Sequence, residues 1–369
     1  MNALHARLLG RIRNEGPLPF AEYMAIALYD PEHGYYSAGG ERTGWRGDFV
    51  TSPELDPAFG SLWARAIEQV WDAAGRPPHF HVIEVGPGEG GFAAALLDVA
   101  TGAFGDALVL TLVELSPVRR ARQAARIGEG ATWVEDVDEI GPVPAGFVFL
   151  NEVLDNQPVH ALRSIDGVVH ELHVAERDGA LVEEWRPCRD EDLVARAAAA
   201  PSDAGTIEIS RAAEGLATRC AALIDKGGTV FVDYGRDGAE QAGDSLVTFS
   251  SSGVDDLRID QPGTRDITAH VDWRPIVEAL ERAGFETFGP HRQRAVLQWL
   301  GAGSVDDDLR QRHSERLERG QGAAAVRMLS RRHALRTLLD PGGLGRLQVV
   351  AGIKGVSTPP FLQKEEDRP

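Results

Sequence analysis

The sequence predicts an α/β fold of the Rossmann-like type, in which helices cover a mostly parallel sheet. Strands and helices alternate through the middle of the chain, which is typical of parallel strands joined by right-handed helical crossovers. Polar residues also follow several of the expected strands directly. Parallel sheets bind their ligands at these carboxyl ends, so we expect a ligand site there.

Residues 1–75 are expected to form an N-terminal region of helices and a loop that covers the substrate. Residues 1–28 read as two helices separated by Gly16-Pro-Leu-Pro19. A further helix is predicted from Pro53 to about Ala74, because its apolar residues recur at helical spacing. The residues between these helices, 29–52, are rich in Gly, Tyr and Ser and show no helical period.

The core is expected over residues 76–355, with inserts near 156–206 and 240–345. Its predicted elements are a strand at 79–85, a helix at 91–99, a strand at 108–114, a helix at 117–127, strands at 132–134 and 146–150, a helix at 207–223 and a strand at 228–232. The first insert reads as a hairpin and a short Ala-rich helix. Helices at 271–283, 292–300 and 304–340 precede a last strand at 347–353. The polar, proline-containing tail at 356–369 is expected to be disordered.

The composition limits the classes of function. The formal net charge is −18, so a duplex nucleic acid would be repelled on average and no nucleic-acid partner is expected. No apolar run approaches the roughly 20 residues that span a bilayer, and the N-terminus lacks the apolar stretch of a secretory signal. The two cysteines are too few for a disulfide framework or a zinc site. We therefore expect a cytoplasmic protein without a metal.

The glycine-rich segment at 86–91 is the most informative motif. It satisfies the dinucleotide-binding pattern G-x-G-x-x-G, but Glu84 and Glu89 bracket the turn. These carboxylates would repel the pyrophosphate of a nicotinamide cofactor, and they favour the cationic sulfonium and ammonium of S-adenosylmethionine. The loop therefore predicts S-adenosylmethionine as the cofactor. The residues expected to contact it are Glu84, Gly86, Pro87, Gly88 and Gly90.

Two further acids are candidates for cofactor binding. Glu114 ends the second strand of the core and could accept hydrogen bonds from both ribose hydroxyls. The alternative is that Glu114 caps the helix that starts at Ser116. Asp136 follows the strand at 132–134 and could accept a hydrogen bond from the adenine amino group.

The segment Asn151-Glu-Val-Leu-Asp155 follows the fourth strand and is expected to face the methyl acceptor. Asn151 could orient an amine through its amide oxygen. Ionised Glu152 and Asp155 match the planar donors of a guanidinium, and they could help to remove the proton that is lost on methylation. The alternative is that these acids only decorate a helix N-terminus. Asp48, in the loop ahead of Pro53, could reach the cofactor's ammonium or the substrate.

An ordered series of motifs resembles the MidA family over nearly the whole chain. The main blocks are Tyr29-Asp-Pro-Glu-His-Gly-Tyr-Tyr36, Gly47-Asp-Phe-Val-Thr-Ser-Pro-Glu54, Glu84-Val-Gly-Pro-Gly-Glu-Gly90, Val113-Glu-Leu-Ser-Pro117, Asn151-Glu-Val-Leu-Asp155, Phe231-Val-Asp-Tyr-Gly235 and Pro262-Gly-Thr-Arg-Asp266. The resemblance implies a class I methyltransferase with a seven-stranded sheet. It implies that Gly86, Gly88, Gly90 and Glu114 hold the cofactor, and that Asp48, Asn151, Glu152 and Asp155 lie near the acceptor.

The resemblance also carries a functional expectation. Mitochondrial members of the family are protein arginine methyltransferases that assist assembly of respiratory complex I, which implies a partner protein such as a respiratory-complex subunit. Two alternatives are an assembly factor that binds S-adenosylmethionine without turnover and a methyltransferase for a small molecule. The chain departs from the family at Asp155-Asn-Gln-Pro158, where Asp-Ala-Leu-Pro is usual, and it lacks a usual His within 244–253. These departures concern the substrate more than the cofactor.

Overall fold

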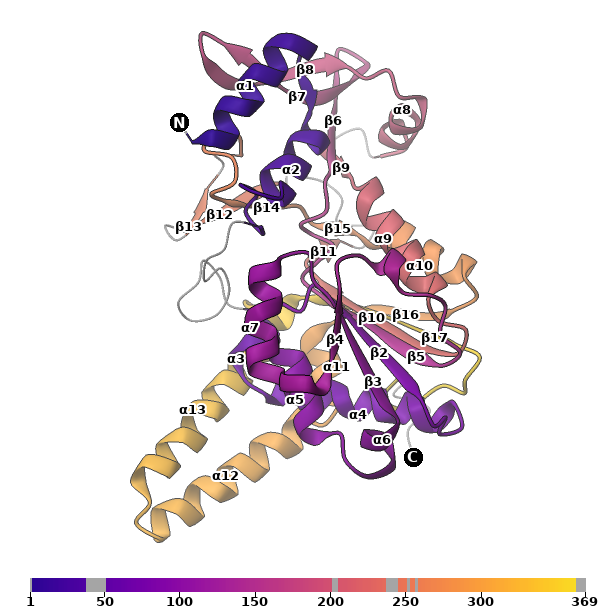
Figure 1. Ribbon diagram of the computed structural model, residues 1–369, viewed down its shortest axis with the longest axis vertical. Coiled ribbons are helices and arrows are strands. Elements are labelled where there is room, and N and C mark those ends of the chain that lie inside the picture. The colour runs from indigo at the N-terminus through magenta and orange to yellow at the C-terminus, as the bar shows by residue number, and fades with distance from the viewer. Residues whose placement is uncertain are drawn as a thin grey trace.

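The centre of the molecule is a seven-stranded sheet of order β16-β17-β10-β5-β2-β3-β4 (Figure 1). The structure is a computed structural model that describes residues 2–37, 51–200, 205–236, 245–250, 253–255 and 258–362. The strands are β2 (Phe80–Val85), β3 (Leu108–Val113), β4 (Thr132–Val134), β5 (Gly146–Asn151), β10 (Gly227–Asp233), β16 (Glu286–Arg292) and β17 (Gln348–Lys354). Within this sheet only β17 runs antiparallel to its neighbours. The predicted Rossmann-like, mostly parallel sheet is confirmed.

Helices cover both faces of this sheet (Figure 1). Successive side chains of a strand point to opposite faces, and in β5 Phe147 and Phe149 lie in one apolar cluster while Val148 and Leu150 lie in another. The first cluster includes α4 (Ala58–Ala73), α5 (Gly91–Val99) and α11 (Gln293–Trp299), and the second includes α9 (Arg211–Ala222) and α10 (Trp273–Arg282). Two-sided burial explains why the central strands are almost continuously apolar.

A second, smaller body lies beyond the carboxyl ends of the parallel strands (Figure 1). Its sheet contains β1 (Leu18–Pro19), β6 (His160–Ile165), β7 (Val168–Arg177), β8 (Ala180–Pro187) and β9 (Ile207–Ile209). Helices α1 (Ala3–Glu15) and α2 (Phe20–Tyr29) bury their apolar sides against Leu172 and Val174 of β7. The segment before the core and the first insert therefore share one apolar core.

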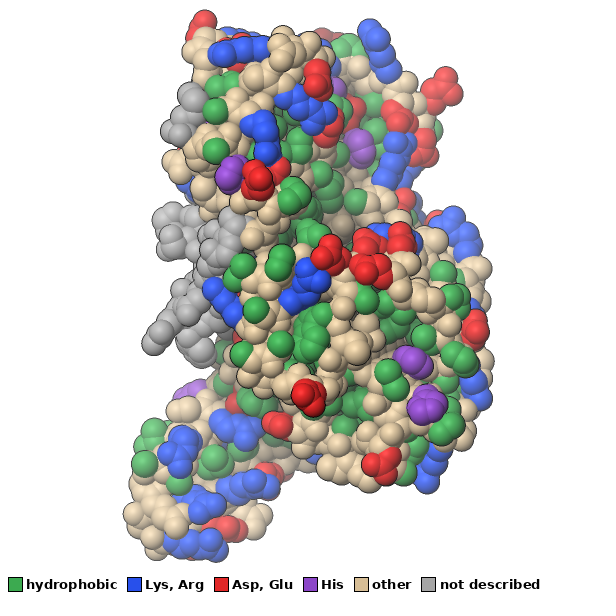
Figure 2. Space-filling view, in the orientation of Figure 1, with side chains coloured by type: hydrophobic (Ala, Val, Ile, Leu, Met, Phe, Trp, Pro, Cys, Tyr) green, Lys and Arg blue, Asp and Glu red, His purple; other side chains and the backbone are tan. Residues whose placement is uncertain are grey.

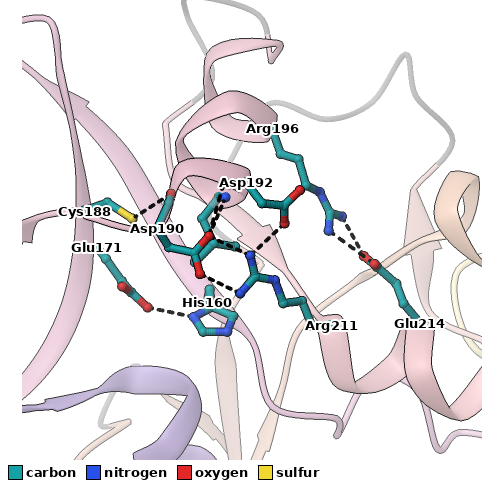
Figure 3. A network of polar contacts seen from close by, with 9 residues as sticks. His160, Glu171, Cys188, Asp190, Asp192, Arg196, Arg211 and Glu214 are labelled. Carbon is teal, nitrogen blue, oxygen red and sulfur yellow. Dashed lines mark hydrogen bonds and ion pairs between the residues drawn. The ribbon is translucent and has the colours of Figure 1, made fainter.

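A network of ion pairs connects this body to the central sheet's helices (Figure 3). Arg211, at the start of α9, makes two hydrogen bonds of 2.7 Å to Asp190, the N-cap of α8 (Glu191–Ala198). A third, also 2.7 Å, reaches Asp192. The guanidinium holds the pKa of the Asp190 carboxyl well below its usual range. Arg196 of α8 pairs with Glu214 of α9, so two arginines fasten the insert to the core.

The helix predicted at 53–74 is divided into α3 (Ser52–Leu55) and α4. Asp56 is extended, with φ −156° and ψ 141°, because the residue before a proline avoids the helical region and Pro57 has no N–H to donate. The Asp56 carboxylate then accepts the N–H of Ala58 at 2.8 Å. A continuous helix was therefore a wrong prediction at this point.

The helix predicted at 207–223 also starts later than expected. Residues 207–209 form β9, which pairs antiparallel with β6, and α9 begins at Arg211 with Ser210 as its N-cap. The hydroxyl of Ser210 accepts the N–H of Ala213 at 3.1 Å, which fixes that boundary. The first insert contains the antiparallel strands β6, β7 and β8 instead of a single hairpin.

The predicted disordered tail is wrong for residues up to Leu362. The turn Pro360–Leu362 buries Phe361 and Leu362 in the apolar cluster around α4. The backbone N–H of Phe361 donates to Gln69 at 3.3 Å. Apolar burial of these two side chains offsets the cost of ordering the segment.

Helices α12 (Ala302–Glu318) and α13 (Gly322–Leu338) form a hairpin that projects from the core (Figure 1). Arg side chains gather on it (Figure 2). Arg331 of α13 makes two 3.0 Å hydrogen bonds to the buried Asp56, which connects the hairpin to the break between α3 and α4.

No helix in the described ranges is long and apolar enough to cross a bilayer.

Candidate active site

A cavity of about 430 Å³ lies at the carboxyl ends of β2, β3 and β5. At this point β2 has β3 on one side and β5 on the other, which is where sheets of this topology bind ligands. Residues predicted from separate segments meet on its wall: Glu84, Gly86, Pro87, Gly88, Glu114, Asp136, Asn151 and Glu152. Tyr29 and Tyr36, from the end of α2 and the turn after it, also line the cavity.

The glycine loop gives the cavity an open side. Gly86, Gly88 and Gly90 have φ of 66°, 56° and 80°, a left-handed region that favours glycine. A Cβ placed on Gly88 would have no neighbouring atom within 4 Å, so this position borders open space. Helix α5 begins directly afterwards at Gly91. A ligand can thus approach the backbone of the loop closely.

Glu84 is the acid that the ammonium of a cationic cofactor would meet. The side chain is 3% exposed, and its Oε2 has no hydrogen-bond partner among the described residues. Burial, together with the nearby carboxylate of Glu54, raises the pKa of Glu84 to about 8. An ammonium group would satisfy this orphaned oxygen, so the site fits the amino-acid end of S-adenosylmethionine. Glu89 does not line the cavity and instead pairs with Arg122 at 3.5 Å.

Glu114 has two roles in the structure. Its Oε1 accepts the N–H of Ser116 at 2.8 Å and its Oε2 accepts the amide of Gln123 at 3.1 Å, so it supports the start of α7 (Pro117–Ile127). It also lines the cavity, and burial raises its pKa. Asp136 likewise lines the cavity while pairing with Arg219 at 2.8 Å. The ribose and adenine contacts of these acids remain predictions.

Asn151 and Glu152, which follow β5, place two hydrogen-bond acceptors on the cavity wall. The Asn151 amide donates to Glu152 Oε1 at 2.8 Å, while the buried Asn151 Oδ1 has no partner among the described residues. Glu152 has φ 53°, an uncommon conformation for a residue with a side chain. Burial raises the pKa of Glu152 to about 8, although the hydrogen bond from Asn151 opposes the shift. Glu152 can therefore accept a proton at a pH close to neutral.

Asp155 does not join Glu152 on the cavity wall. It is buried in the interior and its Oδ1 has no partner among the described residues. Burial and the carboxylates of Asp233 and Asp266 raise the pKa of Asp155 well above its usual range. The structure therefore places Glu152 but not Asp155 on the cavity wall, although Glu152 is close enough to contribute to the raised pKa of Asp155. Asp48, the other predicted residue near the acceptor, lies outside the described residues.

The residue that shapes this loop, Asp233, was noted after a predicted strand but was not among the predicted site residues. Asp233 ends β10, and its Oδ2 accepts the N–H groups of Val153 at 3.1 Å, Leu154 at 2.8 Å and Asp155 at 3.3 Å. Its Oδ1 accepts the N–H of Tyr234 at 2.8 Å. Burial raises the pKa of Asp233 to about 7. Its position directly after an apolar strand was the available signal.

Two other cavity residues were not predicted. Glu54 of α3 accepts the N–H of Gly91 at 2.8 Å and pairs with Arg126 at 2.8 Å, so it fixes the glycine loop against α7. Arg119 of α7 lines the cavity beneath Tyr36. No sequence pattern distinguishes Arg119 from the other arginines of its helix, because its burial depends on the turn after α2.

A family described as "Putative S-adenosyl-L-methionine-dependent methyltransferase" matches residues 62–291. The mitochondrial protein arginine methyltransferase NDUFAF7 homolog of Drosophila melanogaster is 30% identical over 331 residues, or 80% of this chain and 74% of that protein. The NDUFAF7 protein of Xenopus laevis is 28% identical over 94% of this chain and 83% of its own length. This chain belongs to that methyltransferase family. The resemblance found in the sequence motifs is confirmed.

A solved structure confirms the fold and the cofactor of this methyltransferase. A protein from Burkholderia thailandensis, crystallised with S-adenosyl-homocysteine bound, is 30% identical to it with a TM-score of 0.86. The match covers 98% of this chain and 95% of the other. The methyltransferase is therefore a class I enzyme that depends on S-adenosylmethionine. Glu84 and the loop at 86–90 are the residues of this chain that would hold that cofactor.

Proposed function

We propose that this methyltransferase transfers a methyl group from S-adenosylmethionine to an arginine side chain of a partner protein. The observation that carries the proposal is the pair of acceptors on the cavity wall, the Glu152 carboxyl and the free Oδ1 of Asn151. The names of the relatives in Drosophila melanogaster and Xenopus laevis, both protein arginine methyltransferases, support it.

The chemistry explains why such acceptors are needed. The cofactor supplies an electrophilic methyl group on its sulfonium. A guanidinium has a pKa above about 12 and is a poor nucleophile while it is protonated. An ionised Glu152 would draw the positive charge toward one nitrogen, and Asn151 Oδ1 would accept a further N–H and fix the plane of the group. Because its pKa is about 8, Glu152 is also a stronger base than an ordinary carboxylate.

Two tyrosines offer a flat surface beside these acceptors. The rings of Tyr29 and Tyr36 are stacked with centroids 5.6 Å apart and an interplanar angle of 25°. The Tyr36 hydroxyl donates to Asp266 at 2.8 Å, and the Tyr29 hydroxyl donates to the carbonyl of Asn156 at 3.3 Å. With their hydroxyls engaged, the rings are held in place. Because Arg119 already lies over the Tyr36 ring, a substrate guanidinium would pack against Tyr29.

We also propose a respiratory-complex subunit as the partner and the cytoplasm as the compartment. The first rests on the MidA motifs, since mitochondrial members of that family assist assembly of complex I. The second rests on the composition, because only two cysteines are present, which is typical of a reducing compartment.

Labelled-methyl transfer into a lysate of cells that lack this protein tests the proposal. The expected result is label in protein, recovered as methylarginine after acid hydrolysis, and loss of that label with Glu152→Gln. Label in the small-molecule fraction would instead indicate a small-molecule methyltransferase. Binding of S-adenosyl-homocysteine without any transfer would indicate an assembly factor.

A further inference from the structure

The cavity contains one cation that its surroundings leave partly unsatisfied. Arg119 is 8% exposed and lines the cavity, and its Nη2 has no hydrogen-bond partner among the described residues. The other arginine on the cavity wall, Arg219, is paired with Asp136 at 2.8 Å and Asp138 at 3.2 Å. Arg219 therefore has carboxylate partners, whereas Arg119 has none for its Nη2 among the described residues.

The neighbours of Arg119 do not supply the missing partner. Its guanidinium carbon lies 5.2 Å from the centre of the Tyr36 ring, a contact that uses the flat face of the group and leaves its N–H donors free. Glu114 is close enough to interact electrostatically, but its oxygens accept from Ser116 and Gln123. A buried charge with free donors is costly unless an anion reaches it.

We propose that Arg119 is the carboxylate-binding residue of this cavity. Arginine presents paired N–H donors that match the two oxygens of a carboxylate, and the other arginine on the cavity wall, Arg219, is already paired with acids. The carboxylate belongs either to the amino-acid part of S-adenosylmethionine or to an acidic side chain next to the acceptor arginine. Only the second source rests on the proposed function, because the cofactor is set by the family.

Calorimetry on the full chain separates the two sources. S-adenosyl-homocysteine is compared with S-adenosyl-3-thiopropylamine, which is the same molecule without the carboxylate. If the cofactor supplies the carboxylate, the wild type binds the first about tenfold or more tightly than the second. This preference disappears in Arg119→Gln and is intermediate in Arg119→Lys, which keeps the charge and loses the paired donors.

The control is Arg76→Gln, which removes an exposed arginine that also contacts an aromatic ring but lies outside the cavity. Arg76 lies 5.6 Å from the Trp71 ring centre and pairs with Asp72 at the surface. Arg76→Gln should leave the preference for the ligand with a carboxylate unchanged. Thermal melting of each variant shows that it is folded, and the ratio of two affinities measured on one variant cancels any partial unfolding.

The acceptor source has its own measurement. With S-adenosyl-homocysteine bound, N-acetyl-Asp-Arg-amide is compared with N-acetyl-Asn-Arg-amide. A preference of about tenfold for the aspartyl peptide in the wild type, lost in Arg119→Gln, assigns the carboxylate to the acceptor. If neither ratio changes in Arg119→Gln, the proposal is overturned. That result would leave arginine methylation itself untouched, since the lysate experiment measures it separately.

Discussion

The carboxylate of Asp233 accepts the backbone N–H of Leu154 at 2.8 Å. Asp233 ends β10, whereas Leu154 belongs to the loop after the neighbouring strand β5. Through this bond and its companions to Val153 and Asp155, one buried side chain fixes the loop that carries Glu152. The acid on the cavity wall is therefore positioned by an acid that does not line it.

Asp233→Asn should release this loop. An amide can keep some of the accepted hydrogen bonds, but its NH₂ would face backbone donors, so we expect unfolding to become easier by about 1–3 kcal/mol. Methyl transfer should fall at least about tenfold because Glu152 loses its fixed position, while S-adenosyl-homocysteine still binds. Melting curves, transfer rates and calorimetry measure the three effects. Asp272→Asn, a change in the N-cap of α10 away from the cavity, should leave transfer intact.

The rate of methyl transfer should depend on the ionisation of Glu152. Its pKa of about 8 means that the carboxyl is mostly protonated at pH 7 in the free enzyme. We therefore expect kcat/KM for the acceptor to rise with pH and to level off above about 8. Glu152→Gln should lower the rate about 100-fold or more and flatten the rise. An unchanged profile in this variant would assign the ionisation to another group.

Asp155→Asn should act on stability and spare the chemistry. The raised pKa of Asp155 means that the unfolded chain loses this proton at lower pH than the folded protein does. Stability therefore falls as pH rises above the unfolded value of about 3.9. The asparagine cannot ionise. The free energy of unfolding of the variant should therefore exceed that of the wild type by a margin that grows between pH 5 and pH 8, to about 1 kcal/mol or more. Denaturant titrations at both pH values measure it; lost transfer with unchanged stability would restore the catalytic role.

Gly88→Ala should abolish cofactor binding, because the added methyl group would occupy space that the cofactor needs and would strain the backbone. The added methyl group would enter the open side of the cavity, and the residue has φ 56°. Gly102→Ala is a matched control, because Gly102 has φ 60° and open surroundings but lies on the surface away from the cavity. Both variants should lose about 1 kcal/mol of stability. Only the first should fail to bind S-adenosyl-homocysteine in calorimetry.

Glu84→Gln should weaken cofactor binding and remove its pH dependence. In the free protein Glu84 has a pKa of about 8, so an arriving ammonium must displace its proton at neutral pH. Affinity should therefore increase from pH 6 to pH 8 in the wild type, with proton release on binding. Calorimetry in two buffers of different ionisation enthalpy detects that proton. Glu84→Gln should bind about tenfold more weakly and release none; equal affinity would remove Glu84 from the site.

The fold was predictable because its signals are local. Apolar residues with a period of two or 3.6, and the glycines at 86–91, fix strands and helices within short windows. Convergence of the site also followed from topology, since the carboxyl ends of neighbouring parallel strands meet at one edge. This reasoning placed Glu84, Glu114 and Glu152 correctly on one cavity.

The direction of Asp155 was not predictable in the same way. Glu152 and Asp155 are three residues apart and would share one face of a helix. Residues 152–157 instead form bends and a turn, shaped by the left-handed φ of Glu152 and by hydrogen bonds to Asp233. Such a turn depends on a side chain that is distant in the sequence. The burial of Arg119 likewise depends on Tyr36.

The place of β17 in the sheet means that the sheet cannot be completed until residues 348–354 have been synthesised. This strand is the last one in the part of the chain that the structure describes, yet it lies between β10 and β16. Until residues 348–354 leave the ribosome, β10 has a bare edge although all its residues are buried in the finished fold, and β16 has no neighbour to pair with. At about 5–20 residues per second this interval lasts for several seconds. An apolar strand with unpaired amides is a template for aggregation, so the growing polypeptide carries an aggregation-prone edge until β17 is complete.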